Sequence, residues 1–157
     1  MLSKNRRTSA KSPGGSFAIV ASKYNRRYVD AMLRAAKSCL TAAGAKEVLV
    51  VRVPGAYEIP VVAARLARAH TPPLAAIICL GVILRGATTH AQHIGEAVSN
   101  ALAQIQIHHE VPIIHEVLLL ENEQQARERC LDRRHNRGTE AAQTALEMAR
   151  VMCSLDV

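Results

Sequence analysis

A continuous apolar run at residues 75–80 leads into a glycine-punctuated segment, and together they read AAIICLGVILRGATTH. Because no polar residue alternates within the run, it is typical of a strand buried on both faces, as in a parallel sheet covered by helices. Ligands of such sheets bind at the carboxyl ends of the strands. Thr88 and Thr89 can cap the following helix and leave N–H groups for an anion, and His90 falls in its first turn. The segment at 81–90 is therefore predicted to carry the chemistry.

The rest of the chain alternates strands with helices, each recognised by its hydrophobic periodicity. Repeated alternation without a repeat period or linker predicts one domain, an α/β three-layer αβα sandwich around a four-stranded parallel sheet. The right-handed crossover rule then places the strand exits on a common edge. The predicted strands are 17–22, 47–53, the central run from 75 and 111–120, and the helices are 28–40, 60–69, 90–109, one from 122 and a last one striped by Ala142, Ala145, Leu146 and Ala149.

Three of these exits carry polar or aromatic side chains that could form one site. Tyr24 and Asn25 follow the first strand, residues 56–58 follow the second, and His90 ends the segment after the third. Each has a structural alternative: Tyr24 as a rim aromatic, Glu58 as a charge at a helix N-terminus, and His90 as a solvated residue. Their convergence favours a functional site.

Arg129 and Arg133 are four residues apart in the helix predicted from Asn122. That spacing predicts that both lie on one helix face, which could bind an anion or simply be solvated. Asn122 and Gln125 resemble a capping box for the same helix.

The net charge of +7 is concentrated at the N-terminus, where four basic residues and no acidic residue stand in positions 1–13. We therefore expect residues 1–16 to form a basic, flexible tail, or a short targeting remnant, before a single domain at 17–157. The remainder shows no basic stripe with interleaved aromatics, which argues against nucleic-acid binding. A basic nucleic-acid adaptor stays an alternative; its salt-sensitive binding would disappear when residues 1–13 are deleted.

Metal binding and several enzyme classes are not favoured. The four cysteines are scattered without a C-x-x-C pair, which suits a reduced, cytoplasmic setting, and Cys79 is expected to be a small buried hydrophobe. His90 and His93 could share a helix face, but no further ligand stands at metal-site spacing. No P-loop, dinucleotide fingerprint or nucleophile elbow occurs, and no apolar stretch approaches a membrane span.

Four segments in order carry a resemblance: VPGAYEIP (53–60), LGVILRGATTH (80–90), ENEQQARER (121–129) and NRGTEAAQTALEMA (136–149). They resemble the lumazine synthase family, and the similarity runs from residue 17 to residue 149. The resemblance implies a flavodoxin-like fold. It also implies condensation of 5-amino-6-(D-ribitylamino)uracil with 3,4-dihydroxy-2-butanone 4-phosphate in riboflavin biosynthesis, without metal or organic cofactor. Such enzymes form homopentamers whose sites lie between neighbouring subunits.

The resemblance also implies roles for individual residues. His90 corresponds to the histidine that transfers protons, and Arg129 to a phosphate-binding arginine supplied by an adjacent subunit. Tyr24 corresponds to an aromatic that stacks on the pyrimidine, residues 56–58 to the ribityl-binding stretch, and residues 82–84 to backbone that meets the ring. The residues implied to bind substrate are Tyr24, Asn25, Ala56, Tyr57, Glu58, Val82, Ile83, Leu84, Ala87, Thr88, His115 and Arg129.

Two positions depart from the family pattern. His115 stands where many relatives have a phenylalanine, which leaves open a non-catalytic riboflavin- or flavin-binding protein on the same scaffold. The retained His90 and Arg129, which a pure binder would not need, favour the enzyme. The segment LDRRHNRG (131–138) is bulkier and more charged than in relatives that build sixty-subunit shells, which predicts a pentamer or decamer.

Overall fold

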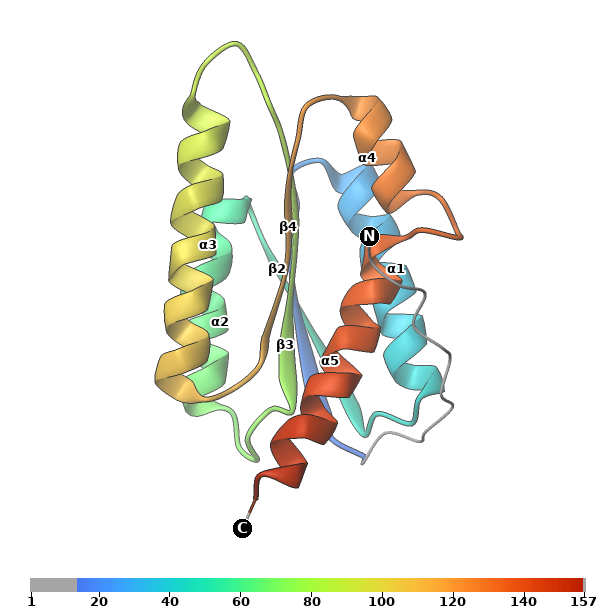
Figure 1. Ribbon diagram of the computed structural model, residues 1–157, viewed down its shortest axis with the longest axis vertical. Helices are drawn as coiled ribbons and strands as arrows, with labels where there is room; N and C mark the ends of the chain where they lie inside the picture. The colour runs from blue at the N-terminus through green and yellow to red at the C-terminus, as the bar shows by residue number, and fades with distance from the viewer. Residues whose placement is uncertain (1–13, 157) are drawn as a thin grey trace.

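The computed structural model describes residues 14–156 and shows a central sheet between two layers of helices (Figure 1). All strands are parallel, in the order β2-β1-β3-β4. This confirms the predicted three-layer α/β sandwich. The strands are β1 (Ser16–Ser22), β2 (Glu47–Val53), β3 (Ala76–Leu84) and β4 (Ile113–Leu120), and the helices are α1 (Arg26–Ala42), the short 3₁₀ helix η1 (Ala56–Glu58), α2 (Ile59–Ala69), α3 (His90–His109), α4 (Glu123–Cys130) and α5 (Arg137–Ser154).

Helices α2 and α3 cover one face of the sheet, and α1, α4 and α5 cover the other (Figure 1). Each face has its own apolar core, and β1 and β3 contribute to both because successive side chains of a strand point to opposite faces. All of β1 and the first seven residues of β3 are buried, as the unbroken apolar run predicts. Cys79 is fully buried within β3, as expected, and burial raises the pKa of its thiol to about 12.

The third strand is longer than predicted, and this changes where the functional loop begins. Residues 81–84 were expected to lie in the glycine-punctuated segment, but they continue β3 and pair in register with Val117–Leu120 of β4. Pairing with a neighbouring strand outweighs the weak breaking tendency of Gly81. The connection from β3 to α3 is therefore only residues 85–89.

Several local predictions hold and others are wrong. Gly44, with φ +87°, follows the end of α1, where a left-handed glycine commonly ends a helix. The Asn122 side chain accepts from the Gln125 N–H at 2.9 Å and so caps α4, although the Gln125 side chain accepts from the N–H of Glu121 instead of Asn122. Arg133 does not share a helix face with Arg129, because α4 ends at Cys130.

Gly138 is a poor helix former by its residue type, yet it lies in the first turn of α5. The Asn136 side chain caps this helix by accepting the Gly138 N–H at 2.8 Å, and it also donates to the Cys130 carbonyl at 2.7 Å. A Cβ at Gly138 would lie 2.0 Å from the Met32 carbonyl oxygen of α1, so only glycine lets the two helices approach this closely.

The predicted N-terminal tail falls mostly on residues 1–13, which lie outside the described residues; β1 begins at Ser16, one residue before the expected domain start. Within residues 14–156, none of the helices has the length and apolar character needed to cross a membrane.

Candidate functional site

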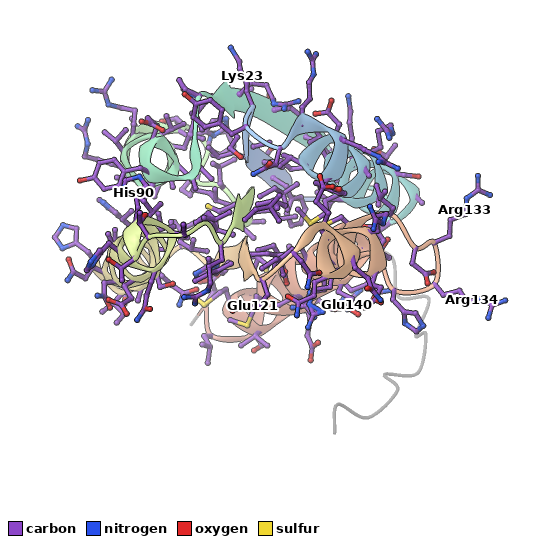
Figure 2. All side chains as sticks on the ribbon, turned by 90° about the horizontal axis from the view of Figure 1, so that it is seen from above. Lys23, His90, Glu121, Arg133, Arg134 and Glu140 are labelled. Carbon is purple, nitrogen blue, oxygen red and sulfur yellow. The ribbon has the colours of Figure 1, made fainter. Side chains whose placement is uncertain are left out.

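A cavity of about 630 Å³ opens at the carboxyl ends of β1, β2 and β3. Figure 2 looks onto this edge of the molecule and places His90 at the start of α3, far from Arg133 and Arg134. The common edge predicted from the parallel topology is thus where the cavity lies. Its lining residues are Tyr24, Asn25, Gly55, Ala56, Tyr57, Glu58, Val82, Ile83, Leu84, Gly86, Thr88, His90, Ala91 and Ile94.

The exit of β1 brings a flat ring and an amide to the cavity. The Tyr24 side chain is 69% exposed, and its ring lies so close to Gly55 that a Cβ there would be 2.9 Å from two ring carbons. Asn25 adopts a left-handed backbone conformation and donates from Nδ2 to the Val82 carbonyl oxygen at 2.6 Å. The exits of β1, β2 and β3 therefore contact one another directly at the cavity.

The exit of β2 forms η1, which carries Glu58. The Gly55 N–H donates to Oε2 of Glu58 at 2.9 Å, so the carboxylate helps to hold its own turn, as the structural alternative anticipated. Glu58 also lines the cavity, and a carboxylate can accept several hydrogen bonds at once. The structural role and a ligand-binding role are therefore compatible.

The connection from β3 to α3 supplies His90 and Thr88. Thr89 occupies the N-cap position, but its side chain makes no capping hydrogen bond. Its φ of −78° and ψ of 3° differ from the extended conformation in which an N-cap oxygen reaches back to the helix, so the predicted capping by Thr89 is wrong. Thr88 instead accepts weakly from the His90 N–H at 3.4 Å. The exposed His90 ring lies at the cavity.

Three of the predicted site residues do not line the cavity: Ala87, His115 and Arg129. Arg129 is exposed on α4, across the sheet from α3. His115 lies on β4, where Nδ1 accepts from the Val117 N–H at 3.2 Å and the other ring nitrogen, Nε2, donates to the Ser99 hydroxyl at 2.8 Å. Burial lowers the pKa of His115, which favours this neutral ring.

Four lining residues were not predicted: Gly55, Gly86, Ala91 and Ile94. The helical spacing contained a signal for Ile94, because it stands four residues after His90 and therefore shares a face of α3 with it. Ala91 follows His90 directly in the first turn of α3. Gly55 and Gly86 line the cavity beside predicted residues, Gly55 next to Ala56 and Gly86 two residues before Thr88.

The charge of Arg137, in the first turn of α5, is locally balanced. Its guanidinium donates to both carboxylate oxygens of the buried Glu116, at 3.1 and 3.0 Å, and to Glu140 at 2.7 Å. Burial raises the pKa of Glu116, and the hydrogen bond and charge of Arg137 partly oppose that shift. Across residues 14–156, no three histidine, cysteine, aspartate or glutamate side chains are grouped so that they could hold a metal ion.

Comparison with known proteins agrees with the geometry. The profile of the 6,7-dimethyl-8-ribityllumazine synthase family matches residues 14–153. The chain is 40% identical over 138 residues to 6,7-dimethyl-8-ribityllumazine synthase of Stenotrophomonas maltophilia strain R551-3, covering 87% of this chain and 88% of that protein. It is 40% identical over 144 residues to the Aquifex aeolicus protein of the same name (90% and 92% covered), and 39% identical over 147 residues to that of Desulfotalea psychrophila (92% and 94% covered). The chain therefore belongs to the 6,7-dimethyl-8-ribityllumazine synthase family.

Proposed function

We propose that this protein is an enzyme that condenses 5-amino-6-(D-ribitylamino)uracil with 3,4-dihydroxy-2-butanone 4-phosphate. The products are 6,7-dimethyl-8-ribityllumazine, phosphate and water, in the pathway to riboflavin. The observation that carries the proposal is the cavity at the strand exits, which gathers most of the predicted site residues from three separate turns. The names of the relatives support the synthase over the flavin-binding alternative.

The cavity suits a flat heterocycle with a polyhydroxyl chain. Tyr24 offers a ring for stacking, and the ends of β3 offer backbone donors and acceptors at residues 82–84. Glu58, at the adjoining turn, suits the hydroxyls of a ribityl chain because ionised carboxylates accept strong hydrogen bonds. Holding an amine against a ketone in this way can supply several kcal/mol of the barrier.

His90 is the proposed proton-transfer residue. Formation of the imine, loss of phosphate and ring closure each require proton movement near neutral pH, for which an imidazole is suited. Its ring is exposed at the cavity beside Thr88, on the side where the phosphate-bearing substrate would lie. Ala87 and Thr88 are proposed to contact that substrate from the connection before α3.

The cavity within one chain lacks a cation for the phosphate. No lysine or arginine is among its described lining residues, and the nearby Arg85 is paired with Glu121 at 3.0 Å. A phosphate needs positively charged partners, for which an arginine fork is well suited. This supports the proposal that Arg129, exposed on α4 of an adjacent subunit, completes the site, with His115 on the same contributing surface.

We propose a pentamer or decamer, because the charged segment at 131–138 differs from the loops of shell-forming relatives. We also propose a cytoplasmic location, because the scattered cysteines suit a reducing compartment. Mass photometry should give a particle of about 85 or 170 kDa, from a chain of 17.0 kDa. A particle of about 1 MDa would instead indicate a sixty-subunit shell.

The decisive experiment for the function is incubation of the purified protein with both substrates while lumazine absorbance and fluorescence are recorded. Appearance of lumazine well above the uncatalysed rate supports the proposal. Tight riboflavin binding without turnover would favour the flavin-binding alternative.

Replacing Arg129 with alanine should chiefly weaken use of the phosphate-bearing substrate. Loss of a charged hydrogen-bond partner should raise its KM by roughly 10- to 100-fold, with a smaller effect on the KM of the pyrimidine. Steady-state kinetics with each substrate varied in turn measure both values. Arg133→Ala, in the loop beyond α4, is the matched control and should behave like the wild type. An unchanged KM for butanone phosphate would remove Arg129 from the site.

A further inference from the structure

A side-chain hydrogen bond, from Asn25 to Val82, joins the exits of β1 and β3. These strands pair from Phe17 and Ala76 to Ala21 and Leu80, and Ser22, the last residue of β1, pairs with Val53 of β2. β3 continues to Leu84, paired only with β4. The last residues of β3 are therefore paired with a strand on the β4 side. On the side facing β1, residues 81–84 have no strand partner.

The backbone of Val82 faces that unpaired edge. Ile77 and Arg85 donate their N–H groups to the carbonyls of Pro112 and Leu120, on the β4 side. The backbone N–H and C=O groups of successive residues point to opposite sides of a strand. Those of Val82 and Leu84 therefore point toward β1. Nδ2 of Asn25 meets the Val82 carbonyl there at 2.6 Å. Since a carbonyl only accepts, the amide nitrogen must be the atom that faces it, and it takes the place of the missing ladder bond.

The backbone of Asn25 is suited to this task. Its φ of 55° and ψ of 41° are left-handed, a conformation that asparagine tolerates better than most residues. It occupies the N-cap position of α1, yet its side chain makes no capping hydrogen bond. The amide therefore does not cap the helix but reaches β3 at the edge of the cavity.

We propose that Asn25 is a positioning residue that sets the separation between the Tyr24 ring and the backbone of residues 82–84. That separation is the width of the slot into which a flat pyrimidine would enter. The identity of the substrate in this inference rests on the proposed function. The hydrogen bond between Asn25 and Val82 is a property of the fold and does not depend on that function.

Two variants test the proposal. Asn25→Asp keeps the size of the side chain but replaces the donor with a second acceptor facing Val82, and Asn25→Gly keeps the left-handed backbone without the amide. Asn25→Asp should raise the KM of the pyrimidine substrate by about 10- to 100-fold, because a buried acceptor loses its partner, with little change for butanone phosphate. Asn25→Gly should give a smaller rise. Asn122→Asp, which keeps its capping acceptor, is the matched control and should leave both KM values unchanged.

Hydrogen–deuterium exchange of the peptide covering residues 82–89 is the second readout. Exchange should be faster in both Asn25 variants than in the wild type and in Asn122→Asp, because the exit of β3 loses its hydrogen bond to Asn25. Unchanged exchange, or equal rises in KM for both substrates, would overturn the positioning role. If the wild type forms no lumazine, the proposed function and the substrate part of this inference fail together. Hydrogen–deuterium exchange of residues 82–89 then decides by itself whether Asn25 holds the exit of β3.

Discussion

Replacing Gly138 with alanine should destabilise the protein by about 3 kcal/mol or more, at the upper end of the usual cost of overpacking. A Cβ at this position would lie 2.0 Å from the Met32 carbonyl oxygen and 2.6 Å from two further backbone atoms of Met32. Backbone cannot swing aside as a side chain can, so α1 and α5 would have to separate. Thermal unfolding followed by circular dichroism should show a melting temperature lower by about 6 to 12 °C for a chain of this size.

The matched control for this prediction is Gly95→Ala, a second glycine inside a helix. A Cβ there would meet the Leu119 side chain at 3.6 Å, which is ordinary van der Waals contact. Alanine is the better helix former, so this variant should be as stable as the wild type or more stable. Both variants are compared at one protein concentration, because an oligomer melts at a temperature that depends on concentration. A melting temperature of Gly138→Ala within about 1 °C of the wild type would contradict the close approach of α1 and α5.

Replacing His90 with alanine should reduce kcat by roughly 10- to 10³-fold without abolishing turnover. The variant loses the proposed proton transfer but keeps Tyr24, Glu58 and the end of β3, which line the cavity and are proposed to position the two substrates. Steady-state formation of lumazine measures kcat, and circular dichroism confirms that the variant is folded. The residual activity would be the contribution of positioning alone.

His93→Ala is the control, because His93 is exposed on α3 and does not line the cavity. Its kcat should remain within about twofold of the wild type, as expected for a surface substitution. An unchanged kcat for His90→Ala, or complete loss of activity in a folded protein, would contradict the assignment of His90 as the proton-transfer residue.

The predictions for His90 and Gly138 differ in their source: the first could be made from the sequence, and the second required the tertiary structure. The position of His90 at the cavity could be predicted from the sequence, because it follows a buried strand and stands in the first turn of a helix. The importance of Gly138 could not, since its partner Met32 is more than a hundred residues away in the chain. In the sequence Gly138 looks like an interruption, and only the contact between α1 and α5 shows it as a packing requirement.

Local residue patterns by themselves determined the layered α/β architecture, because a doubly buried strand and an amphipathic helix differ in their hydrophobic periodicity. They also predicted which turns line the cavity, since parallel strands must end on one edge of the sheet. Only the tertiary structure decided that residues 81–84 belong to β3, that Asn25 reaches Val82, and that Arg129 lies away from the cavity of its own chain. Those features depend on pairing and packing between distant segments, whose free energies are not present in any local stretch of the chain.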